Sequence, residues 1–216
     1  MFTIGKTRKW IAANDKGFTL IEMAVVLIII GLIIGAVVKG KDLVTSAKQK
    51  KLYSKYLQAW QLAYNSYYDR TGWVLGDDDN AGNTNRDARC GDGTSWASEA
   101  NLEAQLTSVG LEIPAEGAAG NTTQRIYRDA GGREYAMSVT FKYFAGLGNY
   151  IEISSANGMA SELGMTWDNI IDGQMDGAVG TFLYAADGTA PTTNTAWPDA
   201  DDAPVPASVG ILRLQF

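Results

Sequence analysis

The stretch that decides the fold is KGFTLIEMAVVLIIIGLIIGAVV, residues 16–38. From Met23 to Val38 every residue is apolar or glycine. With the apolar residues just before it, the run covers residues 18–38, which as a helix spans roughly 30 Å, the thickness of one bilayer core. We therefore expect a membrane-spanning helix over residues 18–42, between a basic leader (residues 1–17) and a globular head (residues 43–216).

Three common explanations of such a run fit less well. A secretory signal would place small residues around a cleavage site beyond the run, whereas Lys39-Gly40-Lys41 follows here. A plain membrane anchor leaves Glu22 unexplained, because a charge within the span costs several kcal/mol unless it is paired or near the interface. A buried helix of a soluble domain rarely continues for this length without a polar residue.

The residues Lys16-Gly17-Phe18-Thr19-Leu20-Ile21-Glu22 resemble the class III signal of type IV pilins and of type II secretion pseudopilins. The resemblance implies that a membrane prepilin peptidase cuts after Gly17 and that the new amino group of Phe18 is methylated. It also implies that the Glu22 carboxylate meets the N-terminal amine of a neighbouring subunit during assembly. Either that contact or a pair with the amine of its own chain would reduce the cost of a charge in hydrocarbon.

Helical periodicity continues beyond the apolar run. Two adjacent stripes recur at three- and four-residue spacing: Leu52, Tyr56, Ala59, Ala63 and Tyr67, and Tyr53, Leu57, Trp60, Tyr64 and Tyr68. So wide an apolar face predicts packing against a head domain rather than an electron-hopping or ligand-stacking stripe. We expect one helix from Phe18 to about Arg70, ended by Gly72.

The rest of the chain predicts a sheet. Alternation is clearest over Glu134–Phe144, and glycines at 146 and 148 would turn it into a second strand over Tyr150–Ser154. Shorter strands fit Thr181–Tyr184 and Ile211–Phe216, and a short helix fits Glu99–Val109. The expected fold class is α+β, a long N-terminal helix packed on an antiparallel sheet of about four strands, the ladle shape that the pilin resemblance implies.

Composition narrows the functional classes. Histidine is absent, Cys90 is the single cysteine, and no phosphate-binding glycine loop occurs. This removes serine–histidine and cysteine–histidine catalysis and internal disulfides, and it leaves open a carboxylate-only enzyme, which no pattern in the sequence supports. We expect no enzyme, no catalytic residues and no bound cofactor. Cys90 is then either a buried thiol or a link between chains. The formal net charge of −6 disfavours broad nucleic-acid binding, although the lysines between Lys48 and Lys55 leave that partner open.

Residues 167–180 form an acidic stretch punctuated by glycines, similar to a turn before a late strand in some minor pilins and pseudopilins. We expect a hairpin loop with positive φ at its glycines. Calcium, which prefers several carboxylate and carbonyl oxygens, is the alternative. The candidate ligands are Asp77, Asp78 and Asp79, assisted by Asp87, and Asp172 with Asp176. The proline-rich segment 190–206 is expected to be a surface loop whose threonines could carry glycans.

These features predict a structural subunit of a type IV pilus filament. The alternatives are a type II secretion pseudopilin or a minor pilin, and, from another class, a membrane-tethered enzyme or ligand-binding head. The resemblance implies further subunits, a prepilin peptidase and methyltransferase, and an assembly platform as partners. It places the precursor in the bacterial inner membrane and the assembled protein at the cell surface.

Overall fold

The computed structural model contains two compact units, Met1–Val44 and Thr45–Phe216, each described here by itself. The residues that the structure describes are 17–77, 88–90, 99–114, 124–186, 195–199 and 205–215.

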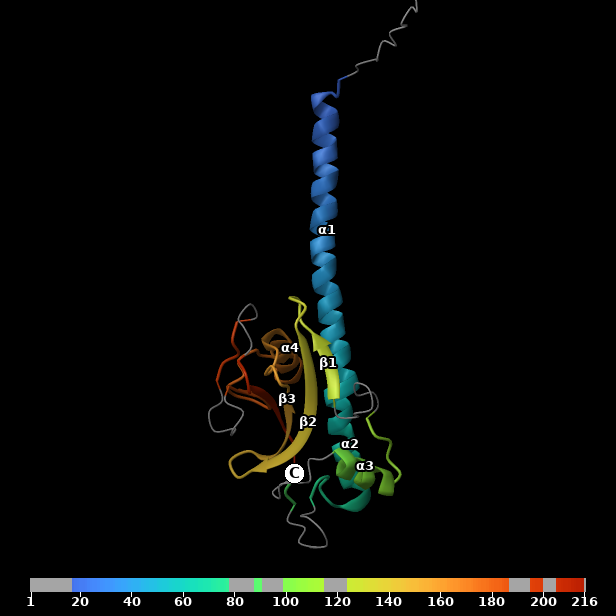
Figure 1. Ribbon diagram of the computed structural model, residues 1–216, viewed down its shortest axis with the longest axis vertical. Coiled ribbons are helices and arrows are strands. Elements are labelled where there is room, and N and C mark those ends of the chain that lie inside the picture. Colours follow the sequence, from blue (N-terminus) through green and yellow to red (C-terminus); the bar gives the residue numbers. More distant parts are fainter. Residues whose placement is uncertain are drawn as a thin grey trace, which may run out of the picture. The chain divides into compact units, whose positions relative to one another are not determined.

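The N-terminal helix is built from three consecutive segments (Figure 1): α1 (Leu20–Leu52), a π-helical segment η1 (Tyr53–Leu57) and α2 (Gln58–Thr71). Gly72 ends it with a left-handed φ of 72°, and its N–H donates to the Tyr68 carbonyl at 2.7 Å. Glycine reaches this conformation without a Cβ clash. The predicted end at Gly72 is confirmed, and the helix begins two residues later than expected.

The head contains a five-stranded antiparallel sheet in the order β1-β2-β3-β5-β4. The strands are β1 (Gln124–Arg128), β2 (Glu134–Phe144), β3 (Gly148–Ser154), β4 (Phe182–Ala185) and β5 (Val209–Arg213). The bounds of β2 match the prediction, whereas β1 was not foreseen, and β5 begins and ends before the predicted 211–216. The α+β class is thus confirmed, with one strand more than expected.

One row of apolar side chains crosses the sheet and shows which face carries the helices. Phe141 pairs with Ile151, Ile151 with Leu212, and Leu212 with Phe182. At one end of the row, Phe141 lies 5.8 Å from the Tyr64 ring in a stacked arrangement. At the other end, Phe182 lies 6.3 Å from the Trp167 ring of α4 (Ser161–Ile171). Both α2 and α4 therefore pack on the same face of the sheet.

The aromatic residues of the long helix are core residues. The buried aromatic residues are Tyr56, Trp60, Tyr64 and Tyr67; together with Leu57 and Ala63 they form a buried face drawn from both predicted stripes. The prediction that the stripes pack against the head is confirmed. On β2, Phe141 contacts the rings of Trp60 and Tyr64, and the Met137 carbonyl accepts the Tyr56 hydroxyl. The alternating residues Tyr135, Met137, Val139 and Phe141 are buried in the same core.

The prediction of a loop over residues 167–180 was wrong for residues 167–171, which are helical. Trp167 and Asp168 belong to α4, where both are buried, and the loop begins only after Ile171. The prediction of positive φ is confirmed at Gly173, Gly177 and Gly180. Another helix, α3 (Glu99–Ser108), agrees with the predicted short helix over 99–109.

Cys90 is a buried thiol. Its side chain is fully buried and donates to the Leu75 carbonyl at 3.2 Å, while its backbone N–H donates to Asn149 Oδ1 at 2.8 Å. Burial raises the pKa of the thiol, so the reactive thiolate is suppressed. Of the two expected states, the structure shows the buried thiol.

Candidate processing and assembly site

The bond between Gly17 and Phe18 lies in exposed, non-helical backbone. Residues 17–19 precede the first helical residue, Leu20, and the Phe18 side chain is 79 % exposed. Among the described residues, no atom lies within 4 Å of the position that a Cβ on Gly17 would occupy. The bond therefore lies outside α1, so cutting it does not require the helix to unwind.

Thr19 and Glu22 form a reciprocal cap at the start of α1. The Thr19 backbone N–H and hydroxyl both donate to Glu22 Oε2 at 2.8 Å, and the Glu22 N–H donates to Thr19 Oγ1 at 3.3 Å. This arrangement is a capping box, which satisfies donors that the first helical turn leaves unpaired. The cap was not predicted, although the T-x-x-E spacing of Thr19 and Glu22 is its sequence signature.

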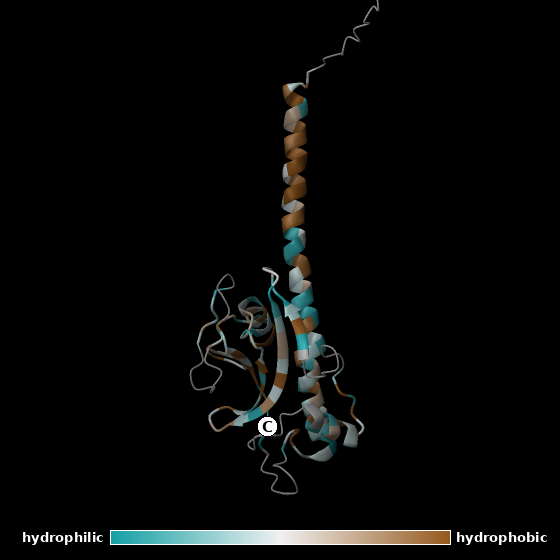
Figure 2. Cartoon of the chain, in the orientation of Figure 1, coloured by the Kyte–Doolittle hydropathy of each residue, from teal (hydrophilic) through white to brown (hydrophobic). Residues whose placement is uncertain are grey.

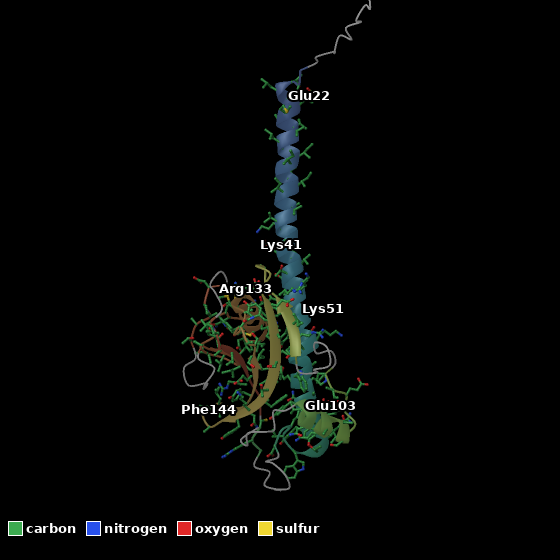
Figure 3. All side chains as sticks on the ribbon, viewed as in Figure 1. Glu22, Lys41, Lys51, Glu103, Arg133 and Phe144 are labelled. Carbon is green, nitrogen blue, oxygen red and sulfur yellow. The ribbon has the colours of Figure 1, made fainter. Side chains whose placement is uncertain are left out.

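The cap gives Glu22 a partner in the uncut chain. Both hydrogen bonds that the Glu22 carboxylate accepts from Thr19 are to Oε2. Within the described part of the chain, Oε1 accepts no hydrogen bond. The expected pairing of Glu22 with an amine at Phe18 requires cleavage and stays a prediction. Figure 3 shows Glu22 in the first turn of α1.

The first part of α1 presents apolar side chains in every direction. All residues from Met23 to Val38 are exposed, including Leu27, Leu32 and Val37 at 66–70 %. Figure 2 shows this part as a nearly continuous brown, hydrophobic band that gives way to hydrophilic teal further along the helix. By length and composition, the helix could cross a membrane. A helix that is hydrophobic all round must be covered by lipid or by other helices.

Asp172 and Asp176, two of the calcium candidates, each use one carboxylate oxygen within the chain. Asp172 Oδ2 accepts the N–H groups of Thr181 and Phe182 at 2.9 and 2.8 Å. Asp176 Oδ1 accepts those of Ala178 and Val179 at 3.0 and 3.1 Å. These bonds fix the loop between α4 and β4.

Of the other candidates, Asp77 belongs to a described segment; it is buried and accepts the Ala88 N–H at 3.0 Å. Asp78, Asp79 and Asp87 lie outside the described residues. Among the residues that the structure describes, no group of three or more acidic or cysteine side chains could hold a metal ion. Calcium at the undescribed aspartates stays a prediction.

The packing of Trp197 against α4 and β4 was not predicted. Its indole N–H donates to Asp168 Oδ2 at 2.8 Å, and its ring lies 5.8 Å from that of Phe182. The indole fills the space left by Gly164 in α4, where an added Cβ would lie only 2.1 Å from a ring carbon. Part of the predicted surface loop 190–206 is thus anchored in the core, while Thr195 beside it is exposed.

Comparison with known proteins assigns the N-terminal region only. A family described as the prokaryotic N-terminal methylation motif matches residues 12–38, which include Gly17, Phe18 and Glu22. Searches of curated proteins and of solved structures found no significant match. The chain therefore carries, at its N-terminus, the class III signal that is the signature of type IV pilins and pseudopilins.

Proposed function

We propose that the chain is the structural, non-enzymatic subunit of a type IV pilus filament. The observation that carries the proposal is the sequence of features along residues 17–38. An exposed Gly17–Phe18 bond is followed within one turn by Glu22, and then by a helix that is apolar on every side. Lipid covers such a helix in the precursor, and the helices of other subunits replace the lipid in the filament.

The roles of Gly17, Phe18 and Glu22 follow from this replacement of lipid by the helices of other subunits. Cleavage after Gly17 leaves a cationic amine on Phe18, which is then methylated. Because a carboxylate without a partner is penalised in an apolar filament core, Glu22 favours the axial position in which it meets the amine of another subunit. The peptidase, the methyltransferase and an assembly platform are the partners of this pathway. The precursor resides in the inner membrane and the filament at the cell surface.

The second candidate is a pseudopilin of type II secretion or a minor pilin. Because Cys90 is the single cysteine of the chain, the head closes no disulfide loop of the kind common in pilins, which favours this second candidate. Both roles use the same N-terminal chemistry and differ in abundance. A major pilin would dominate filaments sheared from the cell surface, whereas the other subunits would be minor components or stay with the cell envelope.

The test of processing is Gly17→Asp in the full-length chain. We expect this variant to keep its leader, seen as a mass higher by residues 1–17. Gly35→Ala is the control, because a Cβ at Gly35 meets no atom within 4 Å. Normal cleavage of the Gly17→Asp variant would contradict the assigned cleavage site.

A further inference from the structure

A basic groove runs along the outer side of the head helix. Its volume is about 910 Å³, and it lies between the helix and Arg125 of β1. Along the helix it is lined by Lys51, Lys55, Leu62 and Asn65, spaced four, seven and three residues apart. This spacing keeps them on one helix face, the one turned away from the buried aromatic residues.

The groove is suited to an anionic partner with some apolar surface. Lys51 and Lys55 are exposed, and none of the described residues that line the groove is acidic. Leu62, 65 % exposed, adds an apolar contact beside the two cations. Such a mixture of charge and exposed leucine is more typical of a protein contact than of a phosphate-tracking groove.

The complementary charge occurs on α3 of the same head. Between residues 91 and 124 the chain has five acidic residues and no lysine or arginine. Glu103 on α3 and Glu112 just after it are exposed. Leu102 and Leu106 of α3 are fully buried, so the helix is fixed on the head with Glu103 directed outward.

The two lysines of the groove and α3 lie at opposite ends of the head helix. Arg70, near the end of α2, donates to the carbonyls of Val109 and Gly110 at 2.8 and 3.3 Å and so holds the end of α3 there. Lys51 is about 19 residues earlier, roughly 30 Å along the helix axis. Figure 3 shows Lys51 and Glu103 at these two ends. Within one copy the two charges are too far apart to neutralise each other.

We propose that the groove binds the acidic α3 region of a second copy of this chain. This contact rests on the proposed filament and extends it to the head. Because different surfaces of the two copies meet, the contact is head-to-tail and can propagate along a filament. Residues 57–216 contain eight basic and 21 acidic residues, so the groove also reduces repulsion between neighbouring heads.

The test is a charge exchange in cells that make the full-length chain. The double variant Lys51→Glu/Lys55→Glu should reduce sheared filaments at least tenfold, and so should Glu103→Lys/Glu112→Lys. Combining all four substitutions should restore most of the filaments. Lys48→Glu/Lys50→Glu is the matched control, because it changes the same charge on exposed positions outside the groove. Leader cleavage and protein level are measured in every variant.

Several results would overturn the contact. One is a loss of filaments in the Lys48→Glu/Lys50→Glu control equal to that in the groove variant. Another is a variant with all four substitutions whose leader is cleaved but which forms no filaments. A third is a groove variant with normal filaments that no longer retains double-stranded DNA, which would make the groove a nucleic-acid site.

Failure of the proposed function is distinguishable, because then the unaltered chain itself forms no filaments. In that case the groove is judged in membranes by disulfide formation between copies of Lys55→Cys/Glu103→Cys. The controls are Lys55→Cys alone and Glu103→Cys alone. Native Cys90, present in every variant, is buried and does not interfere. Disulfide-linked multimers only in the double variant support the contact, and their absence overturns it.

Discussion

The substitution Gly164→Ala tests how the packing of Trp197 against α4 stabilises the head. Gly164 lies inside α4, where alanine normally stabilises a helix by about 1 kcal/mol relative to glycine. Helix propensity alone thus predicts a more stable protein. Packing predicts the opposite, because the added Cβ would lie 2.1, 2.3 and 2.8 Å from three carbons of the Trp197 ring.

The structure decides between these two effects. Contacts shorter than 3 Å cannot be kept, so either α4 shifts or the indole leaves its site. Overpacking of a core costs about 1–3 kcal/mol, and complete loss of a buried tryptophan about 3–5 kcal/mol. After subtraction of the helix-propensity gain of about 1 kcal/mol, the free energy of unfolding falls by up to about 2 kcal/mol if α4 shifts, and by about 2–4 kcal/mol if, as we expect from contacts this short, the indole leaves. For a head of this size that lowers Tm by about 5–15 °C.

The assay is thermal unfolding of the Thr45–Phe216 unit, followed by tryptophan fluorescence, in a double-mutant cycle with Trp197→Ala. Without the indole, Gly164→Ala should stabilise the head by up to about 1 kcal/mol, so the sign of its effect reverses. If Gly164→Ala alone leaves Tm unchanged or raises it, the reasoning is refuted. An equal loss of stability in both backgrounds would also refute it, since the ring would then not be the cause.

The remaining predictions concern Glu22, Asp168 and Cys90. Glu22→Ala should be cleaved normally but assemble no filaments. Glu22→Gln can still cap α1 but carries no charge, so it should also assemble no filaments. Filaments of the Gln variant would show that the helix cap, and not the charge, is required. Burial raises the pKa of the Asp168 carboxyl, so its contribution to stability is present below the unfolded pKa and lost as the pH rises through the folded one. Chemical denaturation from about pH 3 to about pH 7 should therefore show Asp168→Asn gaining stability relative to the unaltered head, and a constant difference would contradict this. Cys90 should react with a thiol reagent at mildly alkaline pH only after unfolding, and rapid labelling of the folded head would contradict its burial.

The sequence predicted elements whose hydrophobic period is long and uninterrupted. The apolar run and the aromatic stripes together placed the helix to within two residues at its start, because nothing in 18–71 breaks the helical pattern. The alternation of Tyr135, Met137, Val139 and Phe141 placed β2 correctly for the same reason. The π-helical turns over Tyr53–Leu57 leave no mark on that pattern.

The missed elements depend on contacts distant in the chain. The helix α4 contains Gly164 and is followed by glycines and aspartates, so local propensity favoured a loop. Gly164 is present because Trp197, 33 residues later, packs against it, which no local pattern reveals. Likewise β1 has only five residues and depends on its pairing with β2, through Ile126 with Ala136 for example.

At the candidate site, the motif predicted the residues but not their local geometry. Gly17, Phe18 and Glu22 were identified from the resemblance, and the family match covers all three. That Glu22 already accepts two hydrogen bonds from Thr19 follows from the T-x-x-E spacing, which was available but was not applied. The basic groove could not be predicted, because Arg125 reaches it from a strand that the sequence did not reveal.

The central claim is that a short leader is removed so that the exposed apolar helix can assemble with copies of itself. The most direct measurement is mass spectrometry of filaments sheared from the cell surface. We predict an abundant chain whose first residue is Phe18 with a methylated amino group. A full-length chain that begins at Met1 and stays in the membrane fraction would contradict the account.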